Sequence, residues 1–266
     1  MNPSILYEDK DILAINKPAG LVVHSDGRST SLTTSKTTEP TLVDWLIKKY
    51  PETRPVRDRE GSQREFISNG IKDVGELGRN SEGEEILRSG IVHRLDRETS
   101  GVMLIAKTQK AFDILKKQFQ NREVKKIYHA FVWGSVKADE GTVDRPIGRS
   151  SKDFRMWSAQ RGARGEMREA VTEYKVLKRL DDYSFVEISP KTGRTHQIRV
   201  HFKAINYPLV ADKLYAPKKE NTLGFKRLAL HSYQITFKDV AGESRTVVAP
   251  YPEDFANAVG VLQSHR

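Results

Sequence analysis

The sequence predicts an α+β fold with a mixed, mainly antiparallel central sheet and flanking helices. Apolar residues run together or alternate at strand spacing in many short segments, whereas few segments show helical spacing. Strand-like and helix-like segments do not alternate strictly, which favours an antiparallel arrangement over a regular βαβ sheet. With 266 residues, 37% hydrophobic and 30% charged, the chain is long enough for a substantial core and a large solvated part.

The first third of the chain begins with strand-like segments and continues into a polar region. Three strands are expected, at 4–7, 11–15 and 21–24. Thr41 and Asp44 have the spacing of a capping box and predict a short helix through Tyr50. Apart from this helix, residues 25–90 are rich in polar and charged side chains, and we expect them to be a flexible insertion.

Apolar periodicity returns at Ile91 and continues towards the C-terminus. Strands are predicted at 101–106, 125–133, 170–177, 183–189, 228–237 and 246–249. Helices are predicted at 109–121, at 195–205 and from Pro252 onward; Thr108 can cap the first. Residues 161–168 are interpreted as a basic surface loop, with or without contact to nucleic acid. We expect residues 1–266 to form a single domain.

The charge balance favours a polyanionic partner. The chain has 45 Lys and Arg against 35 Asp and Glu, a formal net charge of +10. Nucleic acid is the first candidate, and a basic surface without a specific partner is the alternative. The absence of cysteine excludes disulfides, zinc–thiolate sites and cysteine nucleophiles. No signal-peptide core or membrane-length apolar run occurs, so we expect a cytoplasmic protein without membrane contact.

One acid stands among cations in the segment Ile91–Ala106, which reads IVHRLDRETSGVMLIA. Asp96 is flanked by His93, Arg94 and Arg97, and an opposite charge favours the ionised form of a carboxylate. At the mouth of a buried strand, this carboxylate would be a candidate nucleophile. On an open surface, the same residues would be a solvated charge cluster.

A second dense segment, Lys191–His201, reads KTGRTHQIRVH. It gathers Arg194, His196, Gln197 and Arg199 near the start of a predicted helix, where guanidinium groups and a helix N-terminus favour an anion. The anion would be an RNA or DNA phosphate, or Asp96 itself. The alternative is an exposed basic helix face.

Tyr128 lies on a predicted strand beside two lysines, where it either belongs to the core or stacks on a flipped base. We predict no metal site. His93, His196 and Asp96 lack a His-Glu-x-x-His pattern, and only Glu98 offers a second carboxylate nearby.

Together these motifs resemble the RluA-type family of RNA pseudouridine synthases. The matching segments are Ile12–His24, Val92–Gly101, Lys125–Trp133 and Lys191–His201, extended by Tyr207–Tyr215 and Leu228–Tyr233. The resemblance implies a pseudouridine synthase-like fold with a basic active-site cleft. It also implies isomerisation of specific uridines in ribosomal or transfer RNA, on a base flipped out of its stack, without metal or organic cofactor.

The resemblance also implies residue roles. Asp96 is then the essential carboxylate, Tyr128 stacks on the uracil, and Arg194 lies within about 4 Å of Asp96 as its ion-pair partner. Ile198 lies under the base and Arg94 stabilises the flipped state. Further RNA contacts are expected from the remaining polar residues of the motifs: Lys17, His93, His196, Gln197 and Arg199. Whether Asp96 attacks the sugar or abstracts a proton stays open.

Two other functions are compatible with a basic chain. A catalytically silent RNA-binding or ribosome-assembly factor would bind RNA without isomerising uridine, and a metal-dependent nuclease would be inhibited by chelators. We expect a monomer without a separate N-terminal RNA-binding domain. The insertion at 25–90 becomes ordered on RNA or is inert, and we favour an inert one.

Overall fold

The computed structural model describes residues 2–24, 40–56, 89–160, 163–217, 220–221 and 223–264. The chain divides into two compact units. The first comprises Met1–Arg97, Met103–Glu123 and Phe237–Arg245. The second comprises Glu98–Val102, Val124–Thr236 and Thr246–Arg266.

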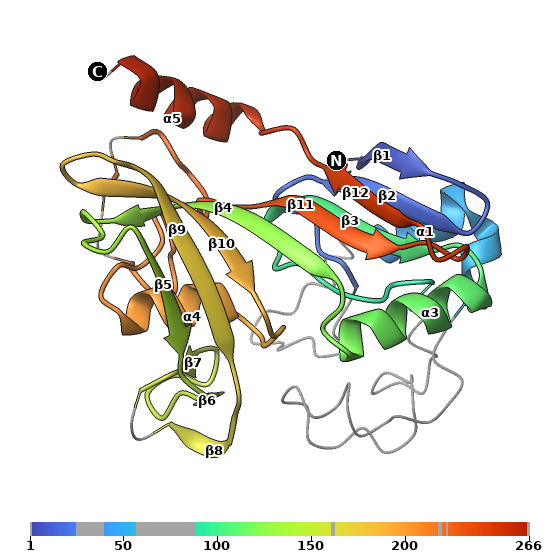
Figure 1. Cartoon of the computed structure of the whole chain (residues 1–266), viewed down its shortest axis with the longest axis horizontal. Coiled ribbons are helices and arrows are strands. Elements are labelled where there is room, and N and C mark those ends of the chain that lie inside the picture. The colour runs from blue at the N-terminus through green and yellow to red at the C-terminus, as the bar shows by residue number, and fades with distance from the viewer. Residues whose placement is uncertain are drawn as a thin grey trace, which may run out of the picture. The chain divides into compact units, whose positions relative to one another are not determined.

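The first unit contains a small sheet and two helices (Figure 1). Its elements are β1 (Ser4–Glu8), β2 (Ile12–Lys17), the end of β3 (Ser100–Ala106), α1 (Leu42–Lys49), the short 3-10 helix η1 (Pro51–Thr53) and α3 (Gln109–Gln120). β1 and β2 are antiparallel, with Ser4 opposite Asn16, and β2 is hydrogen-bonded to β3. Fully buried Leu46 and Leu115 are core residues supplied by the two helices.

Both predicted helices of this unit are confirmed, with their caps. The Thr41 hydroxyl accepts a hydrogen bond from the Asp44 amide at 3.2 Å, while the Asp44 carboxylate accepts one from the Thr41 amide at 2.7 Å. The Thr108 hydroxyl accepts one from the Ala111 amide at 3.3 Å. Residues 40–56 are therefore an ordered part of the region expected to be an insertion. Residues 25–39 and 57–88 of that region lie outside the described residues.

The strand expected at 21–24 is wrong. Leu21 and Val23 are buried, but the carbonyls of Val22 and Val23 accept hydrogen bonds from the amides of Leu42 and Val43 at the start of α1. The alternation of apolar residues correctly indicated that side chains of this segment are buried. Its backbone carbonyls, however, accept hydrogen bonds from the first turn of a helix and not from a neighbouring strand.

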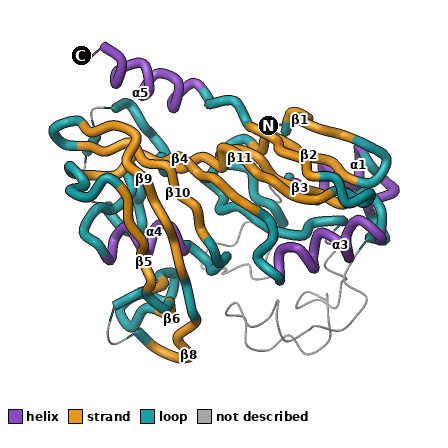
Figure 2. Tube along the Cα trace, viewed as in Figure 1, coloured by secondary structure: helices purple, strands orange, loops and turns teal. Residues whose placement is uncertain are grey.

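The second unit is built on antiparallel strands (Figures 1 and 2). Its main strands are β4 (Lys125–Trp133), β5 (Glu140–Asp144), β9 (Val171–Arg179), β10 (Tyr183–Pro190), β11 (Leu230–Lys238) and β12 (Ser244–Val248), the last two shared with the first unit. They are hydrogen-bonded in the order β11-β4-β10-β9-β5, and each of these pairings is antiparallel. Ser100 and Gly101, at the start of β3, pair with β11 in parallel.

A second sheet joins the strands β7, β6 and β8 in that order. This sheet was not predicted from the sequence. These strands are Trp157–Ser158, Ile147–Arg149 and Arg164–Arg168. The last of them, β8, corrects the interpretation of residues 161–168 as a surface loop, because Arg164–Arg168 pairs with β6. The three strands are short and rich in charge and turn residues, so their alternation is weak. Helix α4 (Gln197–Ala204) contacts β7, β9 and β10, and helix α5 (Glu253–Ser264) closes the chain.

Two features explain the packing of the second unit. Phe131, Phe185, Phe225 and Phe255 belong to one buried aromatic cluster. Gly101 has φ +112°, and a Cβ there would lie 2.1 Å from the Ser232 carbonyl oxygen, so the parallel pairing of β3 with β11 requires glycine.

The observed architecture is α+β with mainly antiparallel strands, as predicted. No helix in the described ranges is long and apolar enough to span a membrane.

Candidate functional site

Asp96 lies in the first unit, in the loop that precedes β3. Its side chain is half-buried, and it follows the buried Leu95. Arg94, two residues earlier, is exposed. Every residue of β3 is buried, so the loop that carries Asp96 continues into a fixed strand.

Lys17 and Arg97 fix this loop. The ammonium group of Lys17, which is fully buried, donates hydrogen bonds to the carbonyls of Pro18, Leu21 and Arg97 at 3.0, 2.9 and 3.1 Å. The Gly20 amide also donates to the Arg97 carbonyl at 2.8 Å, and the Arg97 Nε donates to the Gly20 carbonyl at 3.1 Å. A direct contact of Lys17 with RNA, as predicted, would break these bonds. Its present geometry holds the residue that follows Asp96.

His93 also has partners inside the first unit. Its Nε2 accepts a hydrogen bond from the Leu104 amide at 2.9 Å, which assigns the proton of the neutral ring to Nδ1. The ring stacks on Phe119, with the centroids 4.7 Å apart and 27° between the planes. His93 therefore ties the Asp96 loop to β3 and α3.

Tyr128 lies in the second unit, on β4 between Ile188 of β10 and Ser232 of β11. It is 9% exposed. Lys126 stands two residues earlier, on the same face of the strand. Its ammonium donates to the Thr192 carbonyl at 3.4 Å, and burial lowers the pKa of Lys126 to about 8. Lys126 was not among the predicted site residues, although its spacing from Tyr128 could have indicated it.

Arg194 precedes α4 and is held by Gln197. The buried Gln197 accepts hydrogen bonds from the Thr192 hydroxyl at 2.6 Å and the Arg194 amide at 2.9 Å. Its amide nitrogen donates to the Val171 carbonyl at 3.0 Å and to the Thr172 hydroxyl at 2.9 Å. Arg194 also donates from Nε to the Glu169 carbonyl at 3.0 Å. Gln197 thus fixes the backbone of Arg194. If the Gln197 side chain bound RNA, it would have to give up one of its four hydrogen bonds to protein atoms.

His196 and Arg199 meet at Tyr215. His196 has φ +55°, in the left-handed region, and its Nδ1 lies 3.0 Å from the Tyr215 hydroxyl. That hydroxyl also accepts a hydrogen bond from the Trp157 amide at 3.0 Å. The Arg199 guanidinium makes two hydrogen bonds to Asp212, at 2.8 and 2.9 Å, and stacks on the Tyr215 ring. These groups support the strained start of α4.

Ile198, predicted to lie under the base, is 7% exposed on α4. The second unit thus holds Tyr128, Arg194, His196, Gln197, Ile198 and Arg199, and the first unit holds Lys17, His93, Arg94 and Asp96. Among the described residues, no group of three His, Cys, Asp or Glu side chains could hold a metal ion.

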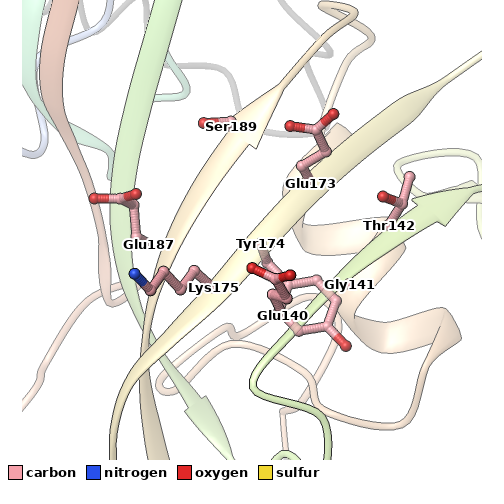
Figure 3. A pocket seen from close by; sticks show the side chains of 8 residues that line it. All are labelled: Glu140, Gly141, Thr142, Glu173, Tyr174, Lys175, Glu187 and Ser189. Carbon is pink, nitrogen blue, oxygen red and sulfur yellow. The ribbon is translucent and has the colours of Figure 1, made fainter.

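A pocket of about 350 Å³ opens on the second unit over β5, β9 and β10 (Figure 3). Glu140, Glu173, Lys175 and Glu187 line it with four smaller or aromatic residues, and none of the predicted site residues does. Lys175 stands opposite both Glu140 and Glu187 in the strand register, so its ammonium offsets part of the negative charge of the three glutamates.

Comparison with known proteins assigns the family. A family model described as RNA pseudouridylate synthase matches residues 11–204. The chain is 36% identical over 267 residues to YlyB, an uncharacterized RNA pseudouridine synthase of Bacillus subtilis strain 168, covering 100% of this chain and 74% of the relative. It is 36% identical over 272 residues to ribosomal large subunit pseudouridine synthase D of Neisseria meningitidis serogroup B, covering 97% of this chain and 61% of the relative.

A solved structure, human RNA pseudouridylate synthase domain containing 4, superposes with a TM-score of 0.67 at 25% identity, covering 98% of this chain and 93% of that one. The family match spans most of the sequence, and the curated relatives align along nearly all of it. The chain therefore belongs to the RNA pseudouridylate synthase family and is an RNA pseudouridine synthase of the RluA type.

Proposed function

We propose that this enzyme isomerises specific uridines of large-subunit ribosomal RNA, with Asp96, Tyr128 and Arg194 acting in one reaction. The observation that carries the proposal is the order HRLD, K-x-Y-x-A and TGRTHQIR in one chain of this family. Ribosomal RNA is favoured over transfer RNA because one close relative is named a ribosomal large subunit pseudouridine synthase. We further propose that the enzyme acts in the cytoplasm as a monomer.

The proposed reaction is an internal rearrangement that balances without a co-reactant. The N1–C1′ glycosidic bond breaks, the uracil turns within the site, a C5–C1′ bond forms, and the proton of C5 leaves while N1 gains one. The target base must first leave its stack. Asp96 acts on the sugar as an ionised carboxylate, either as a nucleophile or as a base, and Tyr128 stacks on the uracil. Ile198 offers the apolar surface, and Arg94 stabilises the flipped state.

The remaining predicted contacts divide into two roles in this proposal. Lys17, Gln197 and Arg199 position the loops that carry Asp96 and Arg194, because their polar groups bind protein atoms. His93 and His196 combine both roles, since each ring has a protein partner and stays partly exposed.

Arg194 is proposed to pair with the Asp96 carboxylate and keep it ionised. Replacing Arg194 with Ala is then expected to lower kcat at least about 10-fold, because one decade corresponds to about 1.4 kcal/mol and a lost desolvated partner costs more than that. The RNA dissociation constant should change far less. A loss of affinity that accounts for the whole loss of kcat/KM would assign Arg194 to RNA binding alone.

The proposed function is tested on ribosomal RNA from cells that lack this gene. Wild-type protein should form pseudouridine at specific sites, and Asp96→Ala protein should form none at those sites. If wild-type protein binds this RNA but isomerises no uridine, the silent RNA-binding factor is correct. Activity should survive EDTA, whereas a metal-dependent nuclease would lose its cleavage.

A further inference from the structure

The small sheet of the second unit, β7-β6-β8, displays an aromatic ring that the proposed reaction does not use. Phe154 lies in the β6–β7 connection and is 77% exposed, whereas the other exposed large hydrophobic side chains of the described residues reach at most 43%. A phenylalanine gains about 1.5–3 kcal/mol from burial. An ordered loop that keeps this ring in solvent gives up that free energy, which points to a ligand for the ring.

The loop is ordered by its own hydrogen bonds. The Ser150 amide donates to the Met156 carbonyl, and the Met156 amide donates to the Asp153 carbonyl, each at 3.0 Å. The Arg149 guanidinium on β6 donates to the Phe154 carbonyl at 3.3 Å. The backbone that carries the exposed ring is thus preformed, so a ligand would bind there without the cost of ordering the loop.

The same sheet concentrates positive charge. The strand register places Arg149 of β6 directly opposite Arg164 of β8, and like charges at opposed positions destabilise a sheet. Arg149 lies 4.2 Å over the Trp157 ring. Arg164 and Lys152 are exposed, and neither side chain has an ion pair within the described ranges. An anionic ligand would relieve this repulsion.

Two nearby arginines, in contrast, have carboxylate partners. The Arg155 guanidinium lies 2.7 Å from an Asp153 oxygen and lowers the pKa of Asp153 to about 2, and Arg168 lies 3.4 Å from Glu166. These pairs keep the loop shape and neutralise part of the charge. The positive charge that remains lies on Lys152, in the same loop as Phe154, and on Arg164, which stands opposite Arg149 on the neighbouring strand.

We propose that this sheet is an RNA-contact surface on which one unpaired nucleotide stacks on Phe154 while Arg164 and Lys152 bind adjacent phosphates. The inference rests on the proposed function, which supplies RNA as the partner. RNA combines negative charge with flat aromatic faces, as this surface requires. An acidic peptide would engage only the cations. A duplex keeps its bases stacked internally, so single-stranded RNA is the preferred ligand.

The test measures the affinity of the full-length protein for a short single-stranded RNA and for the same sequence as a duplex. Phe154→Leu should weaken single-strand binding at least about 5-fold, the lower end of the contribution of one stacked base. Phe154→Trp should keep the affinity, because it keeps a stacking face. Arg164→Gln should reduce the slope of log K against log salt by about 0.7, as expected for one lost phosphate contact on a single strand.

Matched controls separate this surface from general effects. Leu177→Ala removes an apolar side chain that is 41% exposed on β9, and Lys137→Gln removes an exposed positive charge before β5; neither should change the affinity or the salt slope. Thermal unfolding should be unchanged in Phe154→Leu, since the side chain buries little. Equal effects of Leu and Trp at position 154, or wild-type affinity in Phe154→Leu, would overturn the proposal.

Pseudouridine formation on ribosomal RNA, measured in parallel, separates this inference from the proposed function. If wild-type protein forms pseudouridine while Phe154→Leu binds RNA normally, the contact surface is wrong and the function stands. If Phe154→Leu loses affinity but wild-type protein forms no pseudouridine, the contact surface stands and the function is wrong.

Discussion

At the scale of single residues, Gln197 carries an unusual share of the polar contacts around Arg194. All four of its hydrogen-bonding positions are used, and its side chain is 4% exposed. Gln197→Leu would leave the Thr192 hydroxyl and the Arg194 amide without this acceptor. We expect the free energy of unfolding to fall by at least about 2 kcal/mol, since each buried unsatisfied group costs about 1–3 kcal/mol.

Gln160→Leu is the matched control for Gln197→Leu, because the Gln160 side chain is exposed and has no hydrogen bond to other described residues. Its unfolding free energy in urea should equal that of the wild type. An equal effect of both substitutions, or none at position 197, would show that the four contacts do not stabilise the segment.

The sequence identified the motif residues, but it could not show whether each faces RNA or protein. Gln197 donates a hydrogen bond to the Thr172 hydroxyl, and Arg199 donates one to the Asp212 carboxylate. Lys17 bonds the carbonyl of Arg97, eighty residues away in the chain. Partners this distant are set by strand pairing and loop paths, which hydrophobic periodicity does not encode.

At the scale of elements, the start of α4 depends on Tyr215. The helix has no side-chain N-cap, and His196 in the cap position adopts a left-handed conformation. Tyr215→Phe removes the hydroxyl that bonds both His196 and the Trp157 amide. We expect the free energy of unfolding to fall by about 1–3 kcal/mol, because a buried hydrogen-bonding group is lost. We also expect kcat to fall, because Arg194, the proposed partner of Asp96, directly precedes this turn.

A control separates positioning from stability in that experiment. Tyr174→Phe removes a hydroxyl that makes no hydrogen bond with the described residues, and it should leave kcat unchanged. If Tyr215→Phe lowers stability but leaves kcat, KM and the pH profile of the reaction at wild-type values, the hydroxyl is only structural.

The elements differ in how far they could be predicted. Long periodic strands such as β4 and helices with caps at Thr41 and Thr108 were predicted within a few residues, because local chemistry fixes them. The short strands β5 to β8 were not predicted. Their residues are polar or glycine-rich, so pairing with distant partners, not local preference, makes them strands.

At the scale of the whole molecule, buried histidines tie stability to pH. His231 is fully buried between the Ser100 hydroxyl and the Ala249 carbonyl, and burial lowers its pKa to about 4. Burial also lowers the pKa of His129 to about 4, although the Glu187 carboxylate 3.6 Å away opposes this. Between about pH 6.5 and pH 4 the unfolded chain binds more protons than the folded chain, so stability falls as the pH falls.

Urea unfolding at pH 7 and pH 5 tests this linkage. Each histidine is expected to lower the free energy of unfolding by up to about 2 kcal/mol over this interval. His231→Asn cannot titrate, and it should show a smaller difference between the two pH values than the wild type. A free energy of unfolding that does not change from pH 7 to pH 5 would contradict the assignment of neutral, buried histidines.

In the proposed reaction, the Asp96 carboxylate performs the chemistry on the sugar. Asp96→Asn keeps the shape of the side chain and removes its charge. With enzyme in excess over ribosomal RNA, the single-turnover rate of pseudouridine formation should fall by at least about 100-fold while RNA affinity stays near that of the wild type. A variant that forms pseudouridine at a rate close to that of the wild type would show that the Asp96 carboxylate is not needed for the reaction.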